Sequence, residues 1–238
     1  MEPSSSPPEP AILARGLTRV HRLDRRELRS VDDVCLTVAR GEVVALVGPS
    51  GSGKTSLLHL LGGLDSPDSG SVSLAGTDWG TLTADARARF RRRTCGFVVQ
   101  GDSLLPQATA AENVEVPLLF DGVPAAERKS RVLKALQQVG LAEEAAKLPD
   151  QLSVGQHQRV ALARAMITQP AVLLADEPTG SLDSHNAEGV VELMVRAARE
   201  RHMAVVLATH SPEVWARADR ILHLHSGRLA VDPANEVP

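Results

Sequence analysis

Directly after the apolar run Val43-Val44-Ala45-Leu46-Val47, the chain reads Gly48-Pro49-Ser50-Gly51-Ser52-Gly53-Lys54-Thr55. This stretch matches the phosphate-binding loop pattern G-x-x-x-x-G-K-[ST], placed as expected between a strand and a helix. Glycines allow close backbone approach, and successive N–H groups can point into one concavity that holds phosphate oxygens. Lys54 supplies a positive charge for the β- and γ-phosphates, and the Thr55 hydroxyl can bind Mg²⁺. The alternative is a Gly/Ser-rich turn without a ligand; the flanking strand and helix favour nucleotide binding.

Composition limits the class of protein. With 238 residues the chain can form one substantial core, or one core and a smaller subdomain. Charged residues make up 23% and the formal net charge is −3, so no overall basic field indicates binding to nucleic acid. Cys35 and Cys95 both have apolar neighbours, and we expect both to be buried in a reducing, cytosolic compartment. No apolar run approaches the roughly 20 residues that cross a bilayer, so we expect the chain to reach a membrane only through a partner.

Apolar patterns predict the order of strands and helices. The unbroken runs 43–47, 172–175 and 204–208 are typical of a parallel sheet that is covered on both faces. Further strands are predicted at residues 12–14, 34–38, 71–75 and 96–99, and helices at 55–61, 84–93, 125–139 and 156–168, the first ending at Gly62-Gly63. We expect a hairpin loop at residues 21–29, a helical insertion at 104–148, and disordered tails at 1–10 and 232–238.

The predicted helix 84–93 contains five arginines. One interpretation is a solvated helix face, which is the common role of such a charge run. The other is contact with lipid headgroups or with an acidic loop of a partner. The sequence leaves both open.

A second helix start, Leu152-Ser153-Val154-Gly155-Gln156, is also suited to an anion. Ser153 is a good N-cap, and Gly155 permits close backbone approach at the helix start. One chain does not need a second anion site, because its first loop already holds the phosphates. It is explained if the segment closes on the nucleotide of another copy, in a twofold dimer that traps two nucleotides. The alternative is a capped helix with no ligand.

These segments together resemble the ABC-ATPase family over about residues 13–228. Residues 152–156 resemble the family signature LSGGQ, and the first loop matches the Walker A motif. The remaining motifs follow in family order: Gln100 resembles the Q-loop glutamine, residues 171–177 the Walker B motif, Ser181-Leu182-Asp183 the D-loop, and His210 the switch histidine. Residues 58–65 and 175–183 look most like the branch of lipoprotein-release, macrolide-export and cell-division ATPases.

The resemblance implies an α/β fold: a P-loop NTPase core of ABC-ATPase type, with an N-terminal antiparallel β subdomain and a helical subdomain insertion. We expect one ABC ATPase domain at residues 11–231, whose core is 11–99 with 164–231 and whose helical subdomain is 100–163. The resemblance further implies ATP and Mg²⁺, a homodimer that forms on ATP binding, no nucleic acid, and a separately encoded transmembrane permease. The chain would then be cytoplasmic, peripheral on the cytoplasmic face of the membrane through that permease.

Roles carry over residue by residue. Thr55 would ligate Mg²⁺ directly, Asp176 would hold it through water, and Gln100 would reach the metal or the attacking water. Glu177 would orient that water, unless it is merely an acid satisfied at a strand end. His210 would contact the γ-phosphate, although a lone histidine after a strand is usually structural. His21 falls near the family's adenine-stacking aromatic, and its alternative is an exposed loop histidine.

Val154 departs from the signature, where a glycine is usual, and should reduce backbone freedom and weaken closure. The leading function is an ATP-hydrolysing subunit of an ABC transport or extrusion complex. An alternative is a regulatory module that signals to a membrane partner without transport, which a flux measurement in vesicles would separate. A third is a soluble ABC protein of DNA repair, translation or iron–sulfur assembly. Co-purification with a membrane subunit would distinguish this third function from the first two.

Overall fold

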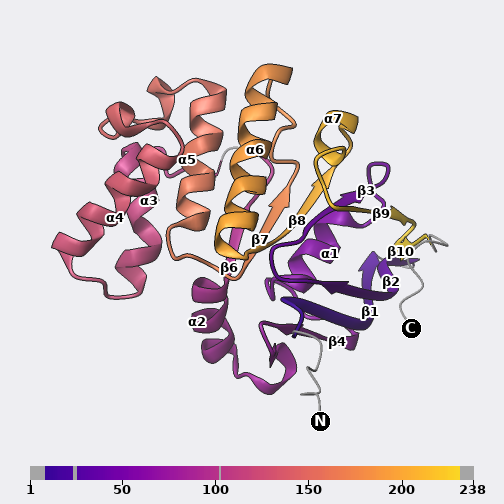
Figure 1. Ribbon diagram of the computed structural model, residues 1–238. Coiled ribbons are helices and arrows are strands. Elements are labelled where there is room, and N and C mark those ends of the chain that lie inside the picture. Colours follow the sequence, from indigo (N-terminus) through magenta and orange to yellow (C-terminus); the bar gives the residue numbers. More distant parts are fainter. Residues whose placement is uncertain (1–8, 24–25, 102, 231–238) are drawn as a thin grey trace, which may run out of the picture.

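The computed structural model describes residues 9–23, 26–101 and 103–230 (Figure 1). Within them, strands form two sheets, and a group of helices lies beside the larger sheet. The predicted tails at residues 1–10 and 232–238 lie outside the described residues, except for Glu9 and Pro10.

The larger sheet has six strands within the described residues. In spatial order these are β10 (Arg228–Leu229), β9 (Arg220–His225), β3 (Val43–Val47), β8 (Ala204–Thr209), β7 (Val172–Asp176) and β6 (Cys95–Val98). Neighbours are parallel except β9 and β10, and every residue of β3, β7 and β8 is buried. The prediction of a covered parallel sheet is therefore confirmed. The carboxyl ends of the parallel strands meet at one edge, called here the carboxyl edge.

Helices cover both faces of this sheet. They are α1 (Lys54–Leu61), α2 (Ala84–Thr94), α5 (Val154–Met166), α6 (Ser184–Arg201) and the short α7 (Pro212–Trp215). Alternate residues of β3 enter different cores: Val44 and Leu46 pack with α1 and the smaller sheet, whereas Val43 and Ala45 pack with α5 and α6. The carboxyl edge is thereby held rigidly from both sides.

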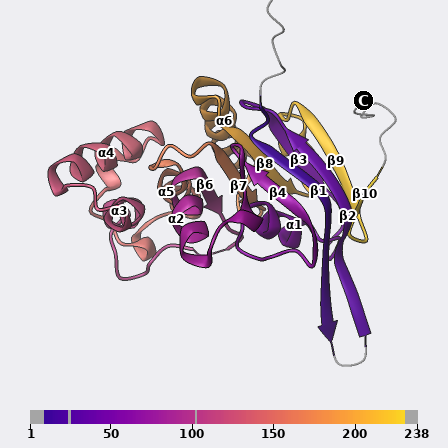
Figure 2. The same cartoon turned by 90° about the horizontal axis from the view of Figure 1, so that it is seen from below.

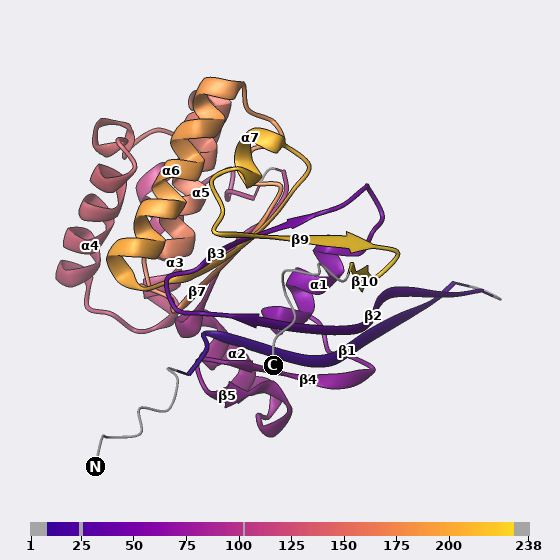
Figure 3. The ribbon, with the colours of Figure 1, turned by 45° about the vertical axis from the view of Figure 1, so that its right-hand side comes forward.

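The smaller, antiparallel sheet forms the predicted β subdomain. Its strands are β1 (Ile12–Leu23), β2 (Arg26–Val38), β4 (Ser69–Leu74) and β5 (Thr77–Asp78), in the order β2-β1-β4-β5. The predicted hairpin is confirmed, but the bounds of its loop, residues 21–29, are wrong, because His21 pairs with Leu28 and Val20 with Arg29. Figures 2 and 3 show that the outer end of this hairpin extends beyond the rest of the molecule. Polar side chains do not prevent strand pairing where the faces are open to water, and Leu28 and Arg29 are exposed.

The two cysteines differ in environment. Cys95 is buried as predicted, and desolvation raises the pKa of its thiol. Cys35 is exposed, so the prediction of a buried residue is wrong. Its neighbours Val34 and Leu36 point into the core, and the strand's alternation places Cys35 on the opposite face.

Residues 104–148 are largely helical, as predicted. They contain α3 (Ala110–Phe120), α4 (Ala125–Gln138) and a 3-10 turn at Ala142–Glu144. Val114 of α3, Leu136 of α4 and Val160 of α5 are fully buried in a third core. This core joins the three helices into one unit at the end of the sheet next to β6.

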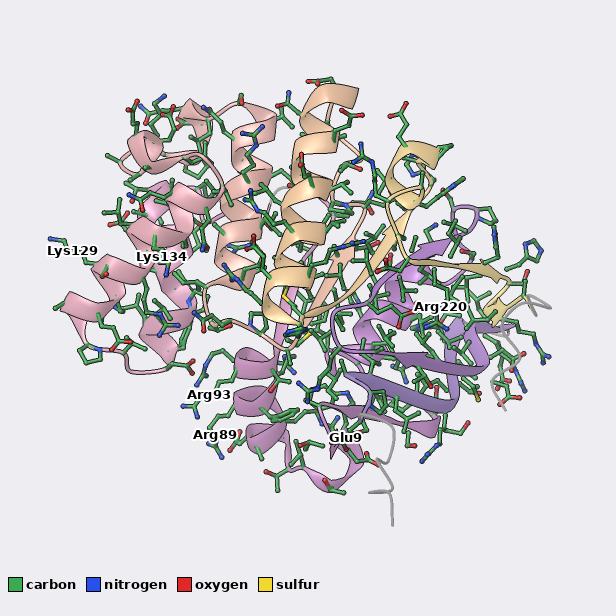
Figure 4. All side chains as sticks on the ribbon, in the orientation of Figure 1. Glu9, Arg89, Arg93, Lys129, Lys134 and Arg220 are labelled. Carbon is green, nitrogen blue, oxygen red and sulfur yellow. The ribbon has the colours of Figure 1, made fainter. Side chains whose placement is uncertain are left out.

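The basic helix α2 is only partly a solvated face. Arg91 donates to the carbonyl oxygen of Gly63 at 2.7 Å, and Arg92 forms a 2.7 Å ion pair with Asp121 beyond α3. Arg89 is exposed, and Figure 4 shows it projecting from α2. Arg87 donates to Ser66 Oγ at 2.9 Å, and Arg93 lies 3.4 Å from Asp121. Four of the five arginines therefore attach the helix to its neighbours, a role that neither earlier interpretation included.

Across the described residues, no helix has both the length and the apolar character needed to cross a bilayer.

Candidate functional site

Residues 48–55, the P-loop, connect the carboxyl end of β3 to α1. Gly51 and Gly53 have φ angles of +78° and +108°, a region that side chains disfavour. A Cβ at Gly53 would lie 1.9 Å from the carbonyl oxygen of Ser30, and one at Gly48 would lie 2.2 Å from that of Leu224. The glycines are therefore required by the packing of the loop against β2 and β9. Within the loop, the N–H of Ser52 donates to the carbonyl oxygen of Pro49 at 3.2 Å.

Lys54 holds the loop from inside. Its Nζ donates to the carbonyl oxygens of Gly48 at 2.8 Å and Pro49 at 3.3 Å. Ser52 Oγ is buried and has no hydrogen-bond partner within the described structure. Gly53 is the N-cap of α1 and has no side chain, so no capping hydrogen bond is made to the N–H groups of the first turn. An unpaired hydroxyl, uncapped N–H groups and an ammonium fit the phosphates of a nucleotide.

Thr55 and Asp176 bring two hard oxygen atoms together. Thr55 Oγ1 donates to Asp176 Oδ2 at 2.7 Å, joining the start of α1 to the end of β7. Asp176 is buried, and hydroxyl and carboxylate oxygens are ligands that Mg²⁺ prefers. Gln100 follows the edge strand β6 and is exposed; the described hydrogen bonds include none from it to either residue. The donor set fits Mg²⁺ at Thr55 and Asp176.

Glu177 and His210 form a second pair at the same edge. His210 Nδ1 lies 3.0 Å from Glu177 Oε2, which is ion-pair distance, but this buried oxygen accepts no hydrogen bond in the described structure. Glu177 also has a φ angle of +46°, which is uncommon for a residue other than glycine. Its backbone N–H donates to the carbonyl oxygen of Ala208 at 2.9 Å, which holds that conformation. A buried carboxylate oxygen that accepts no hydrogen bond is suited to hold a water molecule.

The segment 152–156 begins α5. Ser153 is the N-cap as predicted, but the helix starts at Val154 rather than Gln156. Ser153 and Gln156 form a capping box: Ser153 Oγ accepts from Gln156 N at 3.3 Å, and Gln156 Oε1 accepts from Ser153 N at 2.9 Å. Leu152 packs against the third core, whereas Ser153 and Val154 are exposed. The exposed serine hydroxyl can still donate its proton to an anion.

Gly155 faces the next helix rather than solvent. A Cβ at this position would lie 2.9 Å from Asn186 Oδ1. Asn186 Nδ2 also donates to Asp183 Oδ2 at 2.7 Å, and Asp183 caps the start of α6. Asn186 therefore connects segment 152–156 to residues 181–183, in which Ser181 is exposed and Leu182 packs on the core. Asn186 was not predicted as a site residue, because it belongs to none of the motifs.

The structure brings some predicted site residues together and leaves others apart. The carboxyl edge of the larger sheet carries the P-loop with Thr55, and also Asp176, Glu177 and His210. Figures 1 and 3 place the start of α5 away from α1, with α6 between them in the view of Figure 1. His21 is half-buried on β1 opposite Leu28, two positions along β2 from the Ser30 carbonyl that touches the P-loop. One chain alone therefore does not join segment 152–156 to its own P-loop.

Known proteins resemble this chain in sequence over most of its length. The family described as "ABC transporter" matches residues 31–180. The lipoprotein-releasing system ATP-binding protein LolD of Bordetella pertussis is 47% identical over 223 residues, covering 94% of this chain and 96% of LolD. The pyoverdine export ATP-binding/permease protein PvdT of Pseudomonas aeruginosa is 47% identical over 210 residues, covering 88% of this chain and 32% of PvdT.

A solved structure is also similar over nearly the whole chain. It is the dimeric post-hydrolysis state of the ATP-binding cassette MJ0796 bound to ADP and Pi, at 36% identity and a TM-score of 0.86. The match covers 92% of this chain and 97% of that one.

Proposed function

Because the chain belongs to the ABC transporter family, we propose that its P-loop edge binds Mg-ATP and hydrolyses it against a second copy of the chain. The chain is an ATP-binding and ATP-hydrolysing subunit of an ABC complex that drives a membrane permease.

The observation that carries the proposal is the pairing of two carboxylates with two different partners at one edge. Asp176 meets the Thr55 hydroxyl at 2.7 Å, and Glu177 meets the His210 ring at 3.0 Å. Adjacent residues thus face a hydroxyl group and an imidazole ring. Such a division supports a metal role for Asp176 and a water-holding role for Glu177.

Binding depends on the P-loop, whose backbone N–H groups and Ser52 hydroxyl would hold phosphate oxygens. Lys54 would exchange its contacts with Gly48 and Pro49 for phosphate oxygens. A Mg²⁺ ion bound by Thr55, by Asp176 through water and by Gln100 would neutralise phosphate charge. His21 would stack on the adenine.

Hydrolysis needs a positioned water and stabilisation of the developing charge. Glu177 would hold the water and accept its proton, since its Oε2 is buried at the carboxyl edge and accepts no hydrogen bond. His210 would contact both Glu177 and the γ-phosphate and so fix their relative positions. Its ring is exposed and can turn toward either group. The second copy would supply the Ser153 hydroxyl and the Gly155 N–H to the γ-phosphate, which residues Leu152 to Gln156 of the same chain do not reach.

Movement would start at Gln100, where the helical part begins. We divide residues 11–231 into a core, 11–99 and 164–231, and a helical subdomain, 100–163. Helix α5 crosses the second boundary, so a shift at Ser153 would be transmitted along it into the core. The complex would lie on the cytoplasmic face of the membrane. Relatives with the same 47% identity carry different cargo names, so we assign cargo selection to the membrane partner.

Replacement Glu177→Gln tests the assignment. The variant should bind ATP, release phosphate at least about 100-fold more slowly because a general base is lost, and accumulate as a dimer. Phosphate release and size-exclusion chromatography with ATP measure both effects. Glu192→Gln, which removes an exposed carboxylate from α6, is the matched control and should behave as the wild type. Turnover near the wild-type rate in Glu177→Gln would remove Glu177 from this role.

A further inference from the structure

A cavity lies away from the P-loop, between α4 and the ends of α5 and α6. Its volume is about 330 Å³, near the lower limit for small-molecule sites. The lining residues come from three helices and the loop before β7: Arg131, Lys134, Ala135, Gln138, Ala163, Met166, Ile167, Gln169, Pro170 and Arg201.

The lining is cationic and contains no carboxylate. Arg131 and Lys134 are contributed by α4, and Arg201 enters from α6. On α4, Arg131, Lys134 and Gln138 follow each other at intervals of three and four residues, so they share one face. Three like charges around one hollow repel each other, and an anion bound among them would relieve that repulsion.

These cations have few partners of their own. Arg131 donates to the carbonyl oxygen of Ile167 at 2.8 Å and lies 3.4 Å from Glu127. Arg201 donates to Gln138 Oε1 at 2.7 Å. Among the described residues, no hydrogen bond or ion pair reaches the Lys134 ammonium. Since each guanidinium carries five N–H groups, most donors around the cavity remain available.

The cavity lies at the opposite edge of the sheet from the nucleotide site. Pro170 precedes the amino end of β7, whereas the P-loop follows the carboxyl end of the parallel strand β3. A dimer that joins the P-loop edge of one copy to the Ser153 segment of another would therefore leave this cavity open.

We propose that this cavity binds a small phosphate-bearing anion. A phosphate monoester carries about −1.5 to −2 charges at pH 7, which suits three surrounding cations. Guanidinium groups match phosphate oxygens in pairs, and Lys134 adds a point charge. Ala135, Met166 and Pro170 provide an apolar floor for a short carbon skeleton. The anion would join α4 to Arg201 of α6, adding to the existing Arg201–Gln138 contact between the helical part and the core.

The test uses the whole chain with saturating Mg-ADP, which occupies the P-loop. Glycerol 3-phosphate is titrated while backbone amide chemical shifts are followed by NMR. Shifts should concentrate at Gln138, Gln169 and Arg201. The variant Lys134→Glu should weaken binding by about 10-fold or more, because a charge-assisted contact becomes a repulsive one. Lys129→Glu is the matched control: Lys129 is exposed on the same helix, and Figure 4 shows it pointing outward.

Two arms separate the sources of the phosphate. Binding of glycerol 3-phosphate that Lys134→Glu weakens and Lys129→Glu retains supports a soluble phosphate ester. Co-sedimentation with phosphatidylglycerol vesicles that follows the same variant pattern, without binding of the soluble ester, supports a lipid headgroup. Equal weakening by both variants, shifts confined to the P-loop, or no binding in either arm would overturn the proposal. Basal ATPase activity should stay unchanged in Lys134→Glu, so this test is independent of the proposed hydrolysis site.

Discussion

Helices α1 and α5 both start at sites suited to an anion, but their first turns are completed differently. The α1 start has a glycine N-cap with φ +108° and no side-chain cap. The α5 start is closed by its own Ser153–Gln156 capping box. The α1 end is therefore incomplete until an anion binds, whereas the α5 end is stable alone and offers one exposed hydroxyl. This contrast predicts that α1 controls nucleotide binding and that α5 controls hydrolysis in the dimer.

The largest expected effect comes from Lys54→Ala. The ammonium bridges the loop carbonyls and would bind two phosphates, and each charge-assisted hydrogen bond contributes roughly 1.5–3 kcal/mol. ATP affinity of the isolated chain should fall at least about 100-fold. Isothermal titration calorimetry measures this, with Lys129→Ala as the control that removes an exposed lysine. Unchanged affinity would mean that Lys54 serves only to hold the loop.

Ser153→Ala should separate the two helix starts. It should leave ATP affinity of the isolated chain unchanged and lower the steady-state ATPase rate by about 10-fold or more, because a hydrogen bond to a charged phosphate is lost. The substitution also removes an N-cap, which costs about 0.5–2 kcal/mol of stability.

Ser153→Asp distinguishes these two consequences. Aspartate caps a helix as well as serine does, but its charge repels the γ-phosphate. Stability should therefore return to the wild-type value while hydrolysis stays low. Recovery of the ATPase rate in Ser153→Asp would show that only the cap matters.

Val154→Gly has a smaller expected effect. Val154 is 57% exposed at the start of α5, so its removal leaves no cavity in the core. The ATPase rate should stay the same or rise up to about threefold, since glycine restores backbone freedom at the contact with the second copy. Val154→Ala removes the bulk without adding that freedom, and comparison of the two rates separates the causes. A large loss of activity in Val154→Gly would show that the valine is needed for the contact.

The same contrast explains how much could be predicted from sequence. Helix α1, the buried strands and the Ser153 cap depend on patterns within about ten neighbouring residues, and each was found. Helix α6 at residues 184–201 and strand β9 at residues 220–225 were not predicted. The β9 sequence RILHLH mixes polar and apolar residues, and its strand form depends on pairing with β3, which is remote in sequence.

Long-range contacts also decide details of the site. The polar hairpin end was mistaken for a loop because cross-strand pairing, rather than side-chain polarity, holds it extended. Gly155 was attributed to backbone approach toward a ligand, but the structure adds contact with Asn186, 31 positions later in the sequence. Gly53 is likewise required by Ser30. No local pattern contains either pair.

A third helix start, that of α3, should make the smallest contribution, and this contribution to stability should depend on pH. Thr109 and Glu112 form a capping box in which Glu112 Oε2 accepts from Thr109 N at 2.7 Å and from Thr109 Oγ1 at 2.8 Å. The backbone hydrogen bond from Thr109, followed by the one from its side chain, lowers the pKa of Glu112 below its usual range. A carboxyl whose pKa is lower when folded stabilises the fold above its unfolded pKa, and this contribution is lost as the pH falls through its folded pKa.

The substitution Glu112→Gln should therefore make the free energy of unfolding depend less steeply on pH in the acid range. Glutamine keeps a neutral capping box but does not titrate, so its free energy of unfolding should fall less steeply than that of the wild type on acidification from about pH 5 to about pH 3. Urea unfolding at several pH values measures the two slopes. The difference should be small because Glu112 is exposed to water. Glu143→Gln, which removes another exposed carboxylate without a capping box to alter, is the matched control. If both variants changed the slope equally, the effect would come from net charge, and the capping box at α3 would not differ electrostatically from the neutral one at α5.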